Sequence, residues 1–205
     1  MKFCHIHQVD HALTAAAEHY DFVLVPGLYD SGPDHWQTVW QQRFPFWKRV
    51  TQRKWDDPYI ELWISATSRL VQQCSRPVIL VGHSFGALAS TCVAQEMPEK
   101  VGGLMLVAPA EPSLFGVDYI VPECDLEVPS VVVASHDDRV MQFSRAIHWS
   151  SVWGSELVDL GNAGHINAEA GFGSWLYGLE VLRSLASRVD EQRQEKSELV
   201  LSADC

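Results

Sequence analysis

The order of apolar and helical segments predicts an α/β protein, with a mostly parallel central sheet of about six strands and helices on both faces. Three observations predict this class. Short, apolar, β-branched runs alternate along the chain with longer stretches that indicate helices. At 205 residues and 47% hydrophobic composition, the chain can build one domain with a sizeable core. It contains no internal repeat or low-complexity linker, so residues 1–205 are expected to form a single domain.

The elements are expected in the following order. Strands lie near residues 22–25, 49–53, 77–82, 102–107, 130–134 and 156–160, with helices near 34–43, 58–74, 86–97, 139–148 and 175–190. The first strand ends before Pro26-Gly27, and the first helix opens with Asp34 as its start residue. Pro98 ends the helix that follows the third strand. Residues 1–20 should form an N-terminal extension, and the charged, polar residues 188–205 a C-terminal tail that frays.

The third strand leads into the pattern G-x-S-x-G, which is Gly82-His83-Ser84-Phe85-Gly86. A serine on a sharp turn between a strand and a helix is held with its hydroxyl exposed above the sheet, and glycines two residues before and after it avoid collisions with the neighbouring chain. The bare pattern also arises by chance as a glycine-rich turn. Its position between a buried strand and a helix favours Ser84 as a nucleophile.

An acid and a histidine follow in the order that an α/β-hydrolase requires. Asp137 and Asp138 come directly after the fifth strand, and a Gly/Asn-rich loop after the sixth strand contains His165. A hydroxyl, a base that takes its proton and an acid that orients the base are the parts of a catalytic triad. Ser84, His165 and one of the two aspartates are therefore the predicted catalytic residues.

Asp138 is the predicted acid, because Ser135 closes the strand three residues before it and the apolar Val140 follows two residues after it. Asp137 is then interpreted as a solvated or turn-capping carboxylate. The backbone amides of Phe85, after the nucleophile, and of Leu28, after the first strand, are the predicted oxyanion hole. The alternative interpretation of the segment that contains Leu28 is an ordinary turn at Pro26-Gly27.

Composition excludes several other functions. With 15 basic and 26 acidic residues the formal net charge is −11, which disfavours nucleic acid and anionic lipid as partners. No run reaches the roughly 18 apolar residues of a membrane span. Five scattered cysteines without a C-x-x-C pair are typical of reduced thiols in a cytoplasmic protein. No metal site and no cofactor are expected, and the expected partner is a small, neutral or cationic acyl substrate.

The segment between the fourth and fifth strands, residues 109–128, is too short for the helical cap that encloses long acyl chains in many hydrolases, so the pocket should be open. Phe115 and Tyr119 are expected at its rim, while Trp175 could lie at the rim or in the core. Trp36 and Trp40, one helical turn apart, are expected in the core. His35 is interpreted either as a hydrogen-bonded core residue or as a support for the site.

Several motifs combine into a wider resemblance. They are Val25-Pro26-Gly27-Leu28, Asp34-His35-Trp36, Gly82-His83-Ser84-Phe85-Gly86-Ala87, Ala134-Ser135-His136-Asp137-Asp138, Gly164-His165-Ile166-Asn167-Ala168 and Gly171-Phe172-Gly173-Ser174-Trp175. Together, over about residues 22–180, they resemble the serine hydrolase family of retinoblastoma-binding protein 9 and YdeN. The resemblance implies a compact α/β-hydrolase fold without a large lid, with Ser84, Asp138 and His165 in the triad positions. The Leu-x-Cys-x-Glu motif associated with pocket-protein binding is absent, so the family name does not indicate a function for this chain, and the sequence leaves any protein partner open.

Two functional hypotheses follow from the sequence. The first is a serine hydrolase that cleaves small carboxylic esters or related acyl compounds through an acyl-enzyme. The alternative is a binding or regulatory module that keeps the fold while any catalysis is vestigial.

Overall fold

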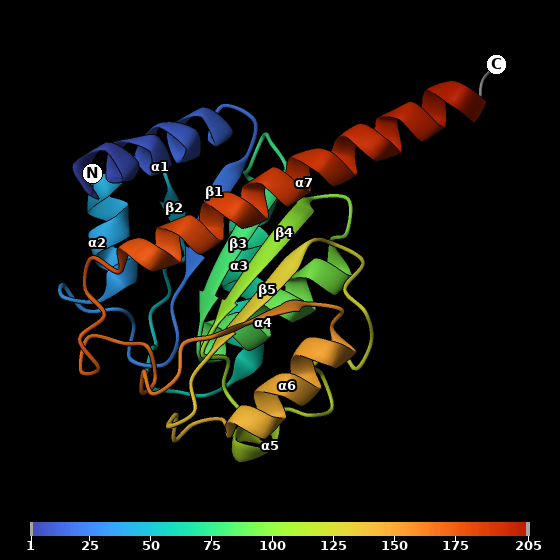
Figure 1. The fold of residues 1–205 in the computed structure, drawn as a ribbon. Coiled ribbons are helices and arrows are strands. Elements are labelled where there is room, and N and C mark those ends of the chain that lie inside the picture. The colour runs from blue at the N-terminus through green and yellow to red at the C-terminus, as the bar shows by residue number, and fades with distance from the viewer. Residues whose placement is uncertain (1, 204–205) are drawn as a thin grey trace.

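The computed structural model describes residues 2–203, which form one parallel six-stranded sheet flanked by helices (Figure 1). The strands are β1 (Asp21–Val25), β2 (Lys48–Arg49), β3 (Val78–His83), β4 (Val101–Val107), β5 (Ser130–Ala134) and β6 (Glu156–Asp159). Their order in the sheet is β2-β1-β3-β4-β5-β6, and every neighbouring pair is parallel. The predicted fold class is confirmed.

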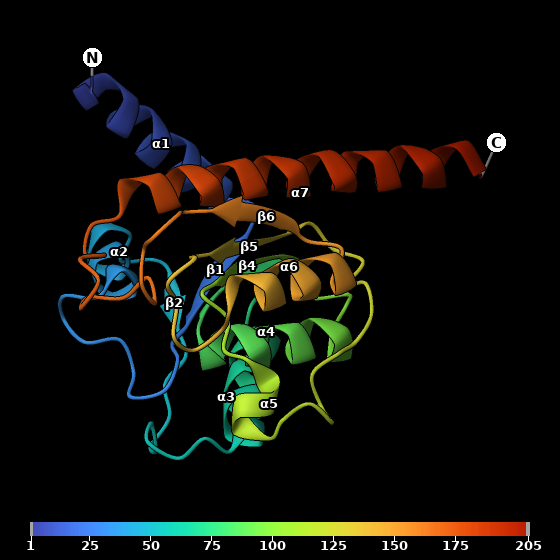
Figure 2. The same ribbon diagram turned by 60° about the horizontal axis from the view of Figure 1, so that its bottom comes forward.

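The helices cover both faces of this sheet. They are α1 (Lys2–Ala16), α2 (Trp36–Arg43), α3 (Ile60–Gln72), α4 (Phe85–Glu96), α5 (Pro112–Phe115), α6 (Phe143–Val152) and α7 (Leu176–Ala203). Figure 2 shows α1, α2 and α7 on one side of the sheet and α3, α4 and α6 on the other. The segment that could have held a cap, residues 109–128, contains only the four-residue helix α5.

Each face of the sheet has its own hydrophobic core. One core joins the strands to α3, α4 and α6, and the other joins them to α1, α2 and α7. In the second core the rings of Trp36, Trp40 and Trp175 pack together, with Trp40 and Trp175 stacked at 5.5 Å between centroids. Trp175 is therefore a core residue, and the prediction of a core role for Trp36 and Trp40 agrees with the structure.

The two ends of the chain differ from the sequence predictions. Residues 2–16 form the helix α1, in which Val9 and Leu13 are buried beside α7 (Figure 1). The tail predicted to fray from residue 188 instead continues α7 to Ala203. Helical spacing places Leu182, Leu185 and Val189 in the core, so the apolar side of α7 reaches into the segment that was expected to fray.

The boundaries of three interior elements also differ. The second strand is only Lys48–Arg49 rather than 49–53, and α6 begins at Phe143 rather than 139. His35, not Asp34, is the N-cap of α2, because its ring nitrogen accepts the Gln37 amide. Asp34 is exposed to solvent.

The carboxyl ends of the parallel strands carry the candidate site. Ser84 follows β3, Asp138 follows β5, His165 lies in the loop after β6, and Leu28 follows β1. Parallel strands end at the same edge of a sheet, which is where α/β proteins place their functional groups. The topology thus brings together four residues that lie far apart in sequence.

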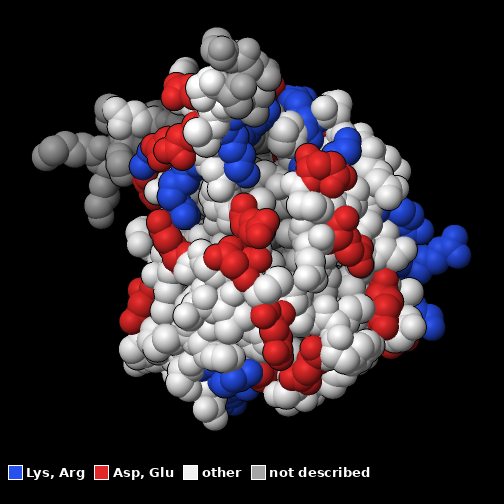
Figure 3. Space-filling model, turned by 90° about the vertical axis from the view of Figure 1, so that its right-hand side faces the viewer, with Lys and Arg blue, Asp and Glu red and all other residues white. Residues whose placement is uncertain are grey.

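The surface carries the acidic excess predicted from the composition. On the face in Figure 3, carboxylates are spread across the middle and the basic side chains lie mostly toward the margins. Within residues 2–203, no helix has the length and apolarity needed to cross a membrane.

Candidate active site

Ser84 occupies a strained turn between β3 and α4. Its backbone angles are φ 54° and ψ −121°, outside the regions that side-chain-bearing residues ordinarily adopt. The flanking glycines make this turn possible. A Cβ on Gly86 would lie 2.3 Å from the carbonyl oxygen of Val25, and one on Gly82 would lie 2.7 Å from the Cα of Ala87. The pattern G-x-S-x-G therefore has a steric cause in this chain.

A continuous chain of hydrogen bonds links Ser84, His165 and Asp138. The Oγ of Ser84 lies 2.8 Å from His165 Nε2, and His165 Nδ1 lies 2.9 and 3.0 Å from the two carboxylate oxygens of Asp138. An ionised carboxylate only accepts hydrogen bonds, so Nδ1 carries the proton and Nε2 is free to accept the serine hydroxyl. The Asp138 side chain is only 3% exposed, whereas the His165 ring is 19% exposed and faces the cavity.

Asp137 has a different role in the same turn. Its Oδ1 accepts the Ser135 hydroxyl at 2.7 Å and the Gly164 amide at 2.8 Å. These hydrogen bonds, that of Ser135 foremost, hold the pKa of Asp137 below its usual value. Of the two adjacent aspartates, the structure brings only Asp138 to the imidazole, while Asp137 is a turn-capping carboxylate beside the His165 loop.

The loop that carries His165 is held at several points. His83 Nε2 lies 2.9 Å from the carbonyl oxygen of His165, and Trp36 Nε1 donates to the carbonyl of Ile166 at 2.9 Å. Burial, and then the nearby His165 and His35, keep the pKa of His83 well below its usual value, so its ring is neutral. Because a carbonyl can only accept, that ring carries its proton on Nε2. The sequence prediction did not find these supports, since neither residue has a spacing that indicates one.

The predicted oxyanion-hole amides lie on adjoining segments. A Cβ on Gly27 would lie 2.9 Å from the Cβ of Ser84 and 3.5 Å from the amide nitrogen of Phe85, so the loop after β1 passes directly over the turn. Among the described residues, neither the Leu28 nor the Phe85 amide donates a hydrogen bond to another group. Two unused donors beside a nucleophilic serine are suited to stabilise a developing negative charge.

This close approach gives the first testable prediction. Gly27→Ala is expected to lower kcat by about 10²–10³-fold, because the methyl group would push the Leu28 amide away from the developing oxyanion. The measurement is steady-state kinetics on a hydrolysed ester together with the thermal midpoint. Gly102→Ala is the matched control, since its new Cβ would find no atom closer than 3.4 Å. Unchanged kcat in folded Gly27→Ala would remove Leu28 from the oxyanion hole.

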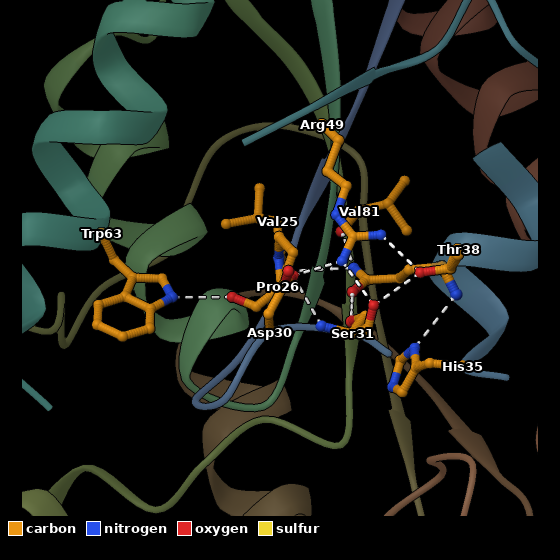
Figure 4. A network of polar contacts seen from close by, with 10 residues as sticks. Val25, Pro26, Asp30, Ser31, His35, Thr38, Arg49, Trp63 and Val81 are labelled. Atoms are coloured by element: carbon orange, nitrogen blue, oxygen red, sulfur yellow. Dashed lines mark hydrogen bonds and ion pairs between the residues drawn. The ribbon is translucent and has the colours of Figure 1, made fainter. Parts of the chain in front are cut away.

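A polar network holds the loop after β1 in place (Figure 4). Arg49 donates to the carbonyl of Ser31 at 2.8 Å and to the Thr38 hydroxyl at 2.7 Å, and it forms an ion pair with Asp30. Tyr29 and Asp30 both have positive φ, 65° and 63°, which is strained for residues other than glycine. The network thus stabilises a strained loop directly beside the Leu28 amide.

Gln37 links this loop to the sheet. Its amide nitrogen donates to the carbonyls of Val81 at 3.0 Å and Val25 at 3.3 Å, and its oxygen accepts the Ser31 hydroxyl at 2.6 Å. The side chain is fully buried, so these bonds compensate its desolvation. In sequence, Gln37 and Arg49 are ordinary polar residues, and only the tertiary structure reveals their contacts.

His35 lies between this network and the cavity. Its Nδ1 accepts the Gln37 amide at 3.2 Å, and its side chain is buried against the ring of His83. Burial first, then the positive charge of Arg49 and the nearby His165, lower the pKa of His35 to about 4. The imidazole is therefore uncharged at neutral pH.

The lowered pKa of His35 predicts a loss of stability in acid. The unfolded chain takes up this proton near pH 6.5, while the folded chain takes it up only near pH 4. Unfolding then binds more protons in this window, so the free energy of unfolding should fall by up to about 3 kcal/mol as the pH drops from 6.5 to 4. Urea unfolding of the wild type and His35→Asn at both pH values measures this. The variant should have the shallower pH dependence, and equal slopes would contradict the prediction.

The cavity beside Ser84 has a volume of about 510 Å³. Its wall includes Leu28, His35, Ser84, Phe115 and His165. The predicted rim position of Phe115 agrees with this wall.

One prediction about the rim was wrong. Tyr119 is 73% exposed, donates to Glu61 and does not line the cavity. Of the two positions expected for Trp175, the structure shows the one in the core described above. The remaining polar wall comes from the strained loop and from residues that follow His165, including Asp30 and Glu169.

Within the part of the chain that the structure describes, no group of three or more His, Cys, Asp or Glu side chains is placed to hold a metal ion.

The parallel sheet and the serine on its strand-to-helix turn define the class of protein, an α/β-hydrolase. A family profile described as serine hydrolase matches residues 22–184, and the chain belongs to this family, that of retinoblastoma-binding protein 9 and YdeN. The resemblance drawn from the motifs is confirmed.

One of the similar solved structures supports this family, and two more distant ones share the fold. A YdeN-like hydrolase from Pectobacterium atrosepticum is 48% identical, with a TM-score of 0.87 over 89% of this chain and 98% of that one. The ydeN gene product of B. subtilis is 21% identical, with a TM-score of 0.68 over 82% and 99% of the two chains. A serine hydrolase involved in carbazole degradation is 14% identical, with a TM-score of 0.62 over 82% and 91%. Among curated proteins, none matches the chain.

Proposed function

We propose that this protein is a carboxylesterase-like serine hydrolase that cleaves small esters or related acyl compounds through an acyl-enzyme. The observation that carries the proposal is the continuous hydrogen-bonded chain from Ser84 through His165 to Asp138, set at the edge of a cavity. The two hydrogen-bond distances suit proton transfer from Ser84 to His165, and an Nδ1–H that donates to Asp138 leaves Nε2 free to accept that proton. The reaction calls for no cofactor, and a small-molecule substrate is the proposed partner.

In the proposed mechanism, Ser84 Oγ attacks the substrate carbonyl while His165 Nε2 takes its proton. The amides of Phe85 and Leu28 stabilise the oxyanion of the tetrahedral intermediate. His165 then returns the proton to the leaving alcohol as the acyl-enzyme forms. Water, activated by the same imidazole, releases the acid and restores Ser84. Asp138 keeps the Nδ1–H tautomer and stabilises the imidazolium that forms in each step.

The alternative function, a binding module with vestigial catalysis, is less well supported by the geometry. A strained backbone at Ser84, and two amides with no hydrogen-bond partner among residues 2–203, are unfavourable for stability and useful for catalysis. Free thiols at Cys74, Cys92 and Cys124 accord with the predicted cytoplasmic location, which stays part of the proposal.

Because the fold has no large cap over the cavity, we predict a preference for short acyl chains. Each methylene buried in an enclosed tunnel would raise kcat/KM about fourfold, at about 0.8 kcal/mol per group. With only α5 in residues 109–128, little material covers the cavity. Acetyl to butyryl esters should therefore be cleaved best, with no further gain by about eight carbons.

A panel of p-nitrophenyl esters from acetate to palmitate, measured below their micellar limits, tests this preference. The Ser84→Ala variant provides the background rate for each ester. A value of kcat/KM that climbs steadily to palmitate would show an enclosed acyl tunnel. Absence of hydrolysis across the panel, with no difference from Ser84→Ala, would favour the binding module.

A further inference from the structure

His35 contributes a polar atom that no described protein group uses. The residue is only 6% exposed, and it lines the same cavity as Ser84. Because Nδ1 accepts the Gln37 amide, the proton of the neutral ring lies on Nε2. Among residues 2–203, this buried Nε2–H has no hydrogen-bond partner. In Figure 4 the second ring nitrogen points away from the network that holds the loop.

Capping of α2 does not account for the whole imidazole. A helix N-cap needs one acceptor, which Ser, Asp or Asn supplies with a shorter side chain. The imidazole adds a donor that the cap leaves unused, and a buried donor without a partner is unfavourable. Since His35 forms part of the cavity wall, the missing acceptor can be supplied by a molecule bound beside Ser84.

The surroundings of His35 indicate which acceptor fits. The ring is packed against His83 at 4.7 Å and Trp36 at 5.3 Å between centroids, so its direction is fixed. It is uncharged, and the carboxylates of Asp30 and Glu169 line the same cavity. Asp30 is paired with Arg49, so Glu169 is the carboxylate that disfavours an anionic ligand. The neutral donor of His35 therefore suits an uncharged oxygen better than a carboxylate or phosphate.

We propose that His35 is a substrate-binding residue whose Nε2–H donates to a second, uncharged oxygen of the acyl substrate. The enzyme then selects esters that carry an ether, hydroxyl or carbonyl oxygen near the scissile bond over hydrocarbon esters of the same size. This inference rests on the proposed esterase function and specifies its substrate class.

The test compares esters that differ only by an oxygen in place of a methylene. The acyl pairs are p-nitrophenyl methoxyacetate with butyrate, and p-nitrophenyl 3-methoxypropionate with pentanoate. A third pair, 2-methoxyethyl and butyl butyrate, places the oxygen on the alcohol side. The ratio of kcat/KM within each pair is measured for the wild type, His35→Asn and His35→Phe. The asparagine keeps a capping oxygen, but its side chain is too short to place an N–H where that of His35 Nε2 lies. The phenylalanine keeps the ring volume and has neither the capping acceptor nor the donor.

The ratio is kcat/KM for the ester with the extra oxygen divided by kcat/KM for its hydrocarbon counterpart. In at least one pair, both variants should lower this ratio by about tenfold, which is the effect of one lost hydrogen bond between neutral groups. Both esters of a pair are measured on the same protein sample, so the fraction of folded enzyme does not affect their ratio. The intrinsic reactivity of the esters is the same for every protein, so it does not affect the change in the ratio from wild type to variant. His148→Asn, the same substitution at an exposed position on α6, should leave all three ratios unchanged.

The outcomes separate this inference from the proposed function. If the wild type cleaves the esters and neither variant changes any ratio, His35 has a structural role only and the inference is overturned, while the hydrolase stands. If only His35→Phe changes the ratios, loss of the cap is responsible and the inference is again overturned. If the wild type cleaves none of the esters and a fluorophosphonate does not label it, the proposed function fails and the inference fails with it.

Discussion

Replacing Ser84 with alanine is expected to lower kcat by about 10⁴–10⁶-fold, because the change removes the only group that forms the acyl-enzyme in the proposed mechanism. The activity that remains would come from the oxyanion hole and substrate binding. The measurement is kcat on the best ester of the acyl panel, with enzyme concentration high enough to detect slow turnover. KM should change little, since the serine oxygen contributes mainly in the transition state.

The thermal midpoint of Ser84→Ala separates this effect from unfolding. Alanine keeps the strained backbone conformation and loses only the hydrogen bond to His165, so the midpoint should stay close to that of the wild type. Ser151→Ala, an exposed serine on α6, is the matched control and should keep full activity. Wild-type turnover in Ser84→Ala would contradict the proposed mechanism.

Asp138→Asn is expected to lower kcat by about 10³–10⁴-fold. An asparagine amide in place of the carboxylate would favour the His165 tautomer with its proton on Nε2, which cannot accept the proton of Ser84. The buried carboxylate also stabilises the imidazolium, and a neutral amide does not. Steady-state kinetics at neutral pH measures the loss.

Asp137→Asn, the same substitution at the neighbouring residue, is the control for Asp138→Asn. The asparagine oxygen can still accept the Ser135 hydroxyl and the Gly164 amide, so the His165 loop should keep its position and activity should change less than tenfold. Equal losses in the two variants would mean that both act through loop geometry. A loss confined to Asp137→Asn would assign the acid to that residue.

Much of the fold could be predicted from the sequence because its strands are short, apolar and buried on both faces. The run Val78–His83 and the run Ser130–Ala134 are fully buried in the sheet, which makes the β-branched pattern a reliable signal. The second strand was misplaced because only Lys48 and Arg49 pair with β1, and two polar residues give no periodic pattern. Tertiary pairing alone defines this edge strand.

The N-terminal helix and the end of α7 were missed for a related reason. Three histidines in residues 5–11 and the charged residues after 188 interrupt the apolar pattern, so neither segment has a strong helical periodicity. The two helices contact one another, and their apolar positions become clear only when Leu13 and Val189 are seen in the same core. Helix propensity over such a segment is a weak signal, and tertiary packing decides whether the helix forms.

The candidate site was predicted in part. Ser84, Asp138 and His165 each follow a strand, and the order of the elements was enough to place them at one edge of the sheet. The support for the Leu28 loop was not predictable, because it depends on Arg49 and Gln37, whose partners lie elsewhere in the sequence. The unused donor of His35 was not predictable either, since burial and hydrogen bonding are properties of the folded chain.

Labelling with a fluorophosphonate probe, followed by mass spectrometry of the labelled peptide, tests the central claim most directly. The probe reacts with a serine only where a base has activated it, so it reports the action of His165 on Ser84 without requiring the natural substrate. The account predicts one modification on Ser84 of the wild-type protein, little in Asp138→Asn and none in Ser84→Ala. A wild-type protein that stays unlabelled, or a label on another serine, would contradict the claim that Ser84 is the activated nucleophile.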